Sequence, residues 1–111
     1  MIFQSILTQF QTLSLGTDAF KKLKQLCEQS IPLAIDSSEQ TALFLIYGFA
    51  KNYVLLYEDQ AVTSEFAQAA KQQLLDYMLQ LGNVIQTGQK DQILDSLNQV
   101  TAEYMQSSRV F

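Results

Sequence analysis

The side chains that usually carry enzymatic chemistry are scarce in this chain, and histidine is absent altogether. Without histidine the sequence cannot form Ser–His–Asp or Cys–His nucleophile pairs, and it lacks the commonest general base. Histidine-bearing metal sites are excluded for the same reason. The calcium-binding EF-hand loop, the phosphate-binding P-loop and the glycine fingerprint of dinucleotide-binding folds are also missing. We therefore predict no catalytic, metal-binding or cofactor-binding residues, and a protein that is not an enzyme.

The single cysteine, Cys27, is spaced with Phe20 and Leu23 as on one face of a helix. A reactive thiol needs an accessible, electropositive environment, whereas a cysteine on an apolar helix face is usually buried and inert. We expect Cys27 to belong to the core. One cysteine cannot form an internal disulfide, which suits a reducing cytosol, so a cytoplasmic location is the default expectation.

Two pairs of carboxylates could act as acid and base or meet a basic partner. Glu58 and Asp59 are adjacent, and Asp91 and Asp95 share one face of a helix. Each pair alone is more typical of solvated surface than of a site, and nothing in the sequence places both in one cleft. The first pair nevertheless follows Tyr57 at an expected helix end, where carboxylates are unfavourable with the helix dipole. An aromatic anchor beside acids suits recognition of lysine or arginine, so these five residues are the candidate partner-binding residues.

The tyrosines and phenylalanines could line a ligand pocket or stack on nucleic-acid bases. Aromatic stripes at helical spacing are more often core than cofactor sites. The net charge is −4 and only the segment FKKLK is basic, against the basic footprint that nucleic-acid binding needs. Residues 1–24 have a net charge of +2, whereas residues 25–111 have a net charge of −6. The larger part of the chain would therefore be steered toward a basic surface, and we favour a protein partner over nucleic acid.

The most apolar stretch, residues 42–57, is interrupted only by Gly48, Lys51 and Asn52. Its length as a helix is about 24 Å, short of the roughly 30 Å of hydrocarbon in a bilayer, and its charge would lie inside the span. The N-terminal segment lacks the basic n-region of a signal peptide. We expect a core helix here and no membrane partner.

Helical periodicity places these residues on five predicted helices. Apolar side chains recur every three or four residues near positions 2–13, 17–30, 38–58, 64–87 and from 91 onward. One proline and four glycines leave little room for the turns of a β-sandwich. We predict an all-α protein, a compact single-domain bundle of four to five amphipathic helices over residues 1–111, with the third helix (about 38–58) central.

The third predicted helix is apolar in nearly every direction over its first half, which is typical of a helix surrounded by neighbours. Leu45, Phe49, Tyr53 and Tyr57 form a four-residue ladder that should lie in the core. Gly48 costs about 1 kcal/mol in a helix interior relative to alanine, so we expect it to allow another helix to approach closely.

Three functions remain open. The first is a non-enzymatic acidic protein that binds a basic or amphipathic surface of a partner, of the inhibitor, immunity or chaperone type. The second is a structural subunit or homodimer whose helix faces complete a larger bundle. The third is a small-ligand carrier or an enzyme that uses carboxylates and tyrosines in a bundle cavity.

Overall fold

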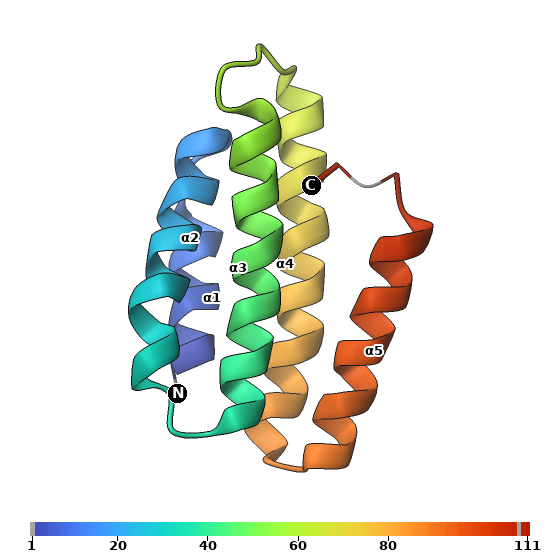
Figure 1. The fold of residues 1–111 in the computed structure, drawn as a ribbon. Helices are drawn as coiled ribbons and strands as arrows, with labels where there is room; N and C mark the ends of the chain where they lie inside the picture. Colours follow the sequence, from blue (N-terminus) through green and yellow to red (C-terminus); the bar gives the residue numbers. More distant parts are fainter. Residues whose placement is uncertain (1, 109) are drawn as a thin grey trace.

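The computed structural model describes residues 2–108, 110 and 111, and this part of the chain forms five α-helices and one short 3₁₀ helix (Figure 1). The α-helices are α1 (Ile2–Thr12), α2 (Thr17–Ser30), α3 (Ser37–Tyr57), α4 (Ser64–Thr87) and α5 (Lys90–Gln106), and η1 (Ile31–Leu33) joins α2 to α3. Helices α1 to α4 run alternately up and down, and α5 packs outside them against α4 and α3 (Figure 1). The all-α bundle predicted from the sequence is confirmed, with no strand among the described residues.

The helix ends follow local backbone chemistry. Asp36 precedes α3, and its carboxylate accepts hydrogen bonds from the first-turn N–H groups of Ser38 at 2.7 Å and Glu39 at 3.3 Å. The Thr63 hydroxyl caps α4 in the same way. Gly88 ends α4 with a φ of 69°, in the left-handed region that glycine adopts at little cost. These caps fix where α3 and α4 begin and where the chain turns toward α5.

The core is built mainly from one face of each of the first four helices. Helix α3 lies between α2 on one side and α4 and α5 on the other, so the third helix is central as predicted. The largest fully buried side chains are Tyr53, Phe3, Phe10, Phe20, Phe111, Leu7, Leu23, Leu43, Ile46, Leu74, Met78 and Leu81. Helix α5 contributes much less, because only Ile93 and Val100 are fully buried on it.

Two expectations for α3 are wrong in detail. Leu45 is only half-buried, because α5 covers that side of α3 incompletely. A Cβ atom at Gly48 would meet nothing within 4 Å, so no helix of this chain uses the space that the glycine leaves. Helix α1 instead packs onto Gly82 of α4, where a Cβ would lie 3.6 Å from Leu7 and 3.7 Å from Phe3.

After α5 the chain turns back over the bundle, and Phe111 inserts among aromatic residues of three helices. Its ring centroid lies 5.2 Å from that of Phe49, 6.0 Å from that of Tyr104 and 6.3 Å from that of Tyr77. The Tyr104 hydroxyl also donates a hydrogen bond to the Phe111 carbonyl. This segment therefore ties α5 to α3 and α4. No helix in the described part of the chain is both long enough and apolar enough to span a bilayer.

Candidate functional site

Helix α3 is apolar on its outer side as well as on its packed inner side. Phe44, Leu55 and Leu56 are 64%, 71% and 53% exposed, respectively. Phe44 and Leu55 are eleven residues apart, so they lie on the same side of the helix three turns from one another, opposite the buried Ile46. Single exposed apolar residues are ordinary on a protein surface, but several on one helix suggest a patch. The exposed Lys51 and Asn52 lie between Phe44 and Leu55, so this patch is interrupted by polar side chains.

A groove of about 200 Å³ borders this patch, between α3 and α5. It is lined by Phe44, Leu45, Gly48, Phe49, Asn52 and Tyr104. Because Gly48 has no side chain, the middle of the groove is open toward solvent. The Phe49 and Tyr104 rings form the link between the two helices, with their centroids 4.7 Å apart.

The near flank of α5 continues the apolar surface. Leu94 and Met105 are more than half exposed. Their spacing of eleven residues puts them on one side of α5, and Met105 lies opposite Glu103, which faces α4 through its bond with Gln80. We call the surface formed by Phe44, Leu55 and Leu56 of α3 with Leu94 and Met105 of α5 the α3–α5 face.

The five candidate residues from the sequence do not form one cluster. Tyr57, Glu58 and Asp59 lie at the end of α3, whereas Asp91 and Asp95 lie in the first turns of α5, at the opposite end of the bundle (Figure 1). All four acids are exposed. The two acidic pairs therefore lie at opposite ends of the bundle.

The environment of the first pair differs from the expectation in two ways. Tyr57 is half-buried, with its ring centroid 4.8 Å from that of Tyr53 and 5.0 Å from that of Phe66, so it is part of the packing at this end. Glu58 is not uncompensated, because it forms an ion pair with Lys21 of α2, and this bond raises the pKa of Lys21. An exposed pair of this kind adds little stability, because water screens it.

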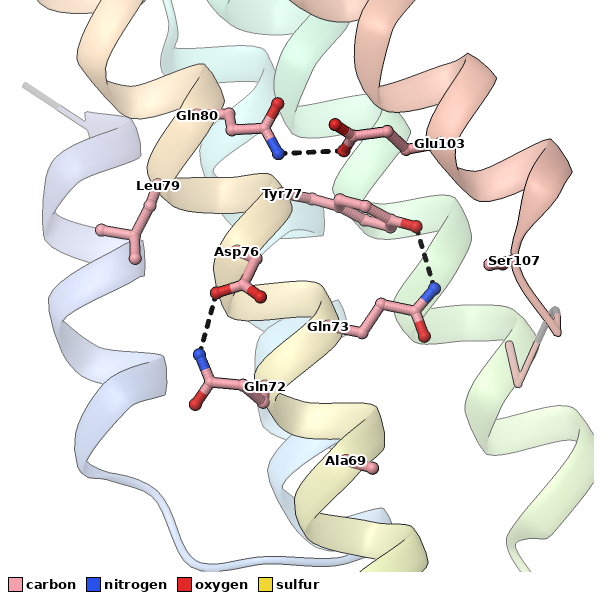
Figure 2. A pocket seen from close by; sticks show the side chains of 9 residues that line it. All are labelled: Ala69, Gln72, Gln73, Asp76, Tyr77, Leu79, Gln80, Glu103 and Ser107. Atoms are coloured by element: carbon pink, nitrogen blue, oxygen red, sulfur yellow. Dashed lines mark hydrogen bonds between the residues drawn. The ribbon is translucent and has the colours of Figure 1, made fainter.

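A second groove, of about 790 Å³, lies on the other flank of α5, between α5 and α4 (Figure 2). It is lined by Ala69, Gln72, Gln73, Asp76, Tyr77, Leu79, Gln80, Glu103 and Ser107. The Gln72 amide donates to the Asp76 carboxylate at 2.9 Å, and the Gln80 amide donates to the Glu103 carboxylate at 3.0 Å. The glutamines thus hold both carboxylates in place.

The sequence reasoning missed this second groove. Its only local signal is the four-residue spacing of Gln72, Asp76 and Gln80, which puts them on one face of α4. Glu103 joins them from a different helix, 23 residues beyond Gln80, and periodicity within one helix cannot reveal such a pairing.

Two buried reactive groups are accounted for by packing. Cys27 is buried as predicted, and burial raises the pKa of its thiol to about 12, so it is protonated at neutral pH. Lys71 is buried too. Its ammonium donates to the carbonyls of Leu13 and Gln11 at the end of α1 and lies 5.4 Å from the centroid of the Phe10 ring. A cation at this position stabilises the C-terminus of α1 through the helix dipole.

Comparison of the chain with models of protein families, with curated proteins and with solved structures finds no match. Among the described residues, no three acidic or cysteine side chains lie together as the ligands of a metal ion would. What can be argued about function therefore rests on the two grooves that flank α5 and on the charges around them.

Proposed function

We propose that this protein is a non-enzymatic binding module, and that its α3–α5 face docks an amphipathic helix of a partner protein. The observation that carries the proposal is the exposure of Phe44, Leu55 and Leu56 on a helix whose inner side is already packed. Large exposed apolar side chains gathered on one side of a monomer are typical of a protein–protein contact.

The shape of the surface favours a helix as the ligand. Two helices with an apolar groove between them form the receptor in the helix-in-groove mode, in which apolar residues of the ligand helix fill the groove. Gly48 lies between Phe44 and Leu55 along α3, and a Cβ atom added there would meet no other described residue within 4 Å. A large side chain of the partner could therefore enter between the two exposed anchors.

The charge around the face favours a partner with basic residues. Asp59 follows the C-terminus of α3, and Asp91 and Asp95 lie in the first turns of α5, at the opposite end of the bundle. The exposed Lys51 lies between them along α3. The lysines of the only basic segment are partly neutralised, because Lys21 pairs with Glu58 and Lys24 pairs with Glu28 at 2.8 Å. An apolar helix stripe with lysine or arginine toward each end would complement this surface and would associate faster at low salt.

The proposal is tested by capture of partners from a lysate of the native host on the immobilised protein. The double variant Phe44→Glu with Leu55→Glu puts two charges into the apolar face without removing a buried side chain. It should keep its helical circular dichroism spectrum and lose the proteins that the wild type retains.

The matched control is Gln9→Glu with Gln25→Glu, which adds the same charge at exposed positions of α1 and α2. This control should capture as the wild type does. Equal capture by the wild type and the Phe44/Leu55 variant would show that the α3–α5 face is not the docking surface.

A second copy of this chain is the alternative ligand for the same face. Phe44 and Leu55 lie on either side of Gly48 and Lys51, so an antiparallel pair of α3 helices would place each Phe44 opposite the other copy's Leu55. Light scattering coupled to gel filtration separates the two cases. A dimer that persists on dilution and dissociates in the Phe44/Leu55 variant would favour the homodimer, and a monomer would favour a different partner.

A further inference from the structure

We infer that α5 is a hinged cover, that the side chain of Phe111 latches it onto α3 and α4, and that opening of this latch regulates docking at the α3–α5 face. The latch is a property of the free protein and goes beyond the proposed function. Only the regulation of docking rests on the proposed function, so the motion and its effect on docking have separate tests.

A short turn, Gly88 and Gln89, joins α4 to α5. A Cβ atom added at Gly88 would meet no other described residue within 4 Å, so packed side chains do not hold the turn at this point. Helix α5 also begins without a side-chain cap, whereas Asp36 and Thr63 cap α3 and α4. Hinges are a few residues at the end of an element that absorb changes in φ and ψ. The turn at Gly88 therefore meets the requirements for a hinge.

From this turn α5 tilts away from α4, and the ribbons of the two helices separate toward the end of α5 (Figure 1). Val100 is the last fully buried residue of the helix. Beyond it, Tyr104 contacts Phe49 of α3, and the Gln80 amide of α4 donates a hydrogen bond to the Glu103 carboxylate. Burial therefore holds the first part of α5 to the bundle more firmly than its end.

Phe111, in the chain that follows α5, returns to the bundle and holds that end in place. It is 2% exposed, and its ring centroid lies 5.2 Å from that of Phe49 on α3 and 6.3 Å from that of Tyr77 on α4. Its ring is parallel to that of Tyr104 on α5 within 6°, and the Tyr104 hydroxyl donates a hydrogen bond to the Phe111 carbonyl. One side chain thus contacts three helices. Because aromatic side chains contribute more to a core than most others, removal of this ring should release the end of α5.

The latch and the groove between α3 and α5 share two rings. Phe49 and Tyr104 line the groove of about 200 Å³, and the same two rings pack against Phe111, which does not line the groove. A groove of this volume holds about one ring-sized group, since a cavity of roughly 150 Å³ binds benzene. A helix docked in a groove instead inserts apolar residues from several of its turns. The groove must widen to admit them, and widening separates Tyr104 from Phe49 and unseats Phe111.

Closure of the latch and docking of a helix therefore compete. When only a fraction of a protein is competent to bind, its apparent affinity is reduced by that fraction. Weakening the latch should then raise the affinity by the same factor by which it raises the open fraction. A Phe111 that only stabilised the fold would not produce this equality.

The motion is measured on the free protein as the distance between two spin labels. Cys27 is buried with a protonated thiol, so the labels attach to introduced cysteines. Gln68→Cys with Gln106→Cys joins exposed positions on α4 and at the end of α5. When Phe111→Ala is added, the population at longer distance should grow severalfold. The control pair, Gln25→Cys with Gln68→Cys, joins α2 to α4 and should keep its distance.

Phe111→Leu keeps a large apolar side chain and should give an open fraction between those of the wild type and Phe111→Ala. It also serves as the test where Phe111→Ala fails to fold. An unchanged distance between α4 and the end of α5 would overturn the latch. Equal broadening in both label pairs would overturn it too, because the whole bundle would then loosen together.

The effect on docking is measured with the partner that the wild type captures, after its purification. Phe111→Ala should bind this partner more tightly than the wild type does, by the ratio of the two open fractions. Equal or weaker binding would overturn the regulation, while loss of binding in the Phe44/Leu55 variant would leave the proposed docking surface standing. A wild type that captures no partner would instead contradict the proposed function, and the spin-label distances alone would then decide whether Phe111 is a latch.

Discussion

Tyr53 is fully buried in the middle of the bundle, yet its hydroxyl has no hydrogen-bond partner among the described residues. Its ring stacks on that of Phe20 with the centroids 3.8 Å apart and lies against Tyr57. Burial raises the pKa of the phenol, so the hydroxyl stays protonated at neutral pH. The ring stabilises the core through its packing. The unpaired hydroxyl destabilises the folded state, because burial removes it from water without giving it a new hydrogen bond.

The substitution Tyr53→Phe should therefore leave the free energy of unfolding unchanged or raise it by about 1 kcal/mol, because only the unsatisfied group is removed. Urea unfolding followed by circular dichroism measures this. Tyr77→Phe is the matched control. It removes a hydroxyl that accepts a bond from Gln73, and it should lower stability by about 0.5–1.5 kcal/mol. A loss for Tyr53→Phe as large as for the control would mean that the Tyr53 hydroxyl is hydrogen-bonded.

Lys71 provides a pH-dependent test of a buried cation. Desolvation lowers its pKa in the folded protein below the ordinary lysine value of 10.5, so between the two values the unfolded chain binds more protons. The contribution of Lys71 to stability must then rise with pH in that window. Lys71→Met should lower stability at neutral pH by about 1–3 kcal/mol, because the Leu13 carbonyl loses its donor.

The difference in unfolding free energy between the wild type and Lys71→Met should widen as the pH approaches 10.5. Lys51→Met, at an exposed position of α3, is the control for the loss of one charge. A difference that narrows with rising pH would contradict the assignment of Lys71 as a buried, desolvated cation.

At the scale of elements, α3 shows what the sequence could and could not predict. Its limits, its cap at Asp36 and its central place follow from local signals and from the apolar pattern. The same pattern suggested a helix surrounded on every side, whereas Phe44 and Leu55 face outward. Periodicity records which residues are apolar. It cannot tell whether an apolar side chain is covered by another helix of the same chain.

The open space beside Gly48 gives a prediction about the outer side of α3. Gly48→Ala should raise the unfolding free energy by up to about 1 kcal/mol, since alanine favours the helix and its Cβ meets no neighbour. The same substitution should weaken partner capture if a partner side chain enters beside Gly48. Thermal unfolding and capture of the same sample measure both effects, and a destabilised Gly48→Ala protein would show that the glycine is needed by the fold itself.

Helix α5 is the least buried of the five α-helices of the described chain, because only Ile93 and Val100 are fully buried on it. Phe111 supplies a further anchor near the end of the chain. Hydrogen–deuterium exchange should therefore be faster in α5 than in α3 and α4. Phe111→Ala should accelerate exchange in α5 further while α1 and α2 keep their protection. Uniform acceleration in all helices would mean that α5 unfolds only together with the bundle.

At the scale of the whole molecule, the acidic bundle divides into sides with different chemistry. One side exposes apolar residues of α3 and α5, and the other flank of α5 carries the glutamine-lined groove with Asp76 and Glu103. Net charge and helix content were predictable from composition and periodicity. The pairing of Gln80 with Glu103 and of Lys21 with Glu58 was not, because each joins two helices and depends on how the helices pack.

The most direct test of the proposed docking surface is a nuclear magnetic resonance titration of methyl-labelled protein with its captured and purified partner. If the partner docks on the α3–α5 face, the methyl signals of Leu55, Leu56, Leu94 and Met105 should shift first and most. The methyl signals of the buried Leu7 and Leu23 on α1 and α2 should change little. Shifts confined to α1 and α2, with the four methyl-bearing residues of the face unaffected, would contradict the account.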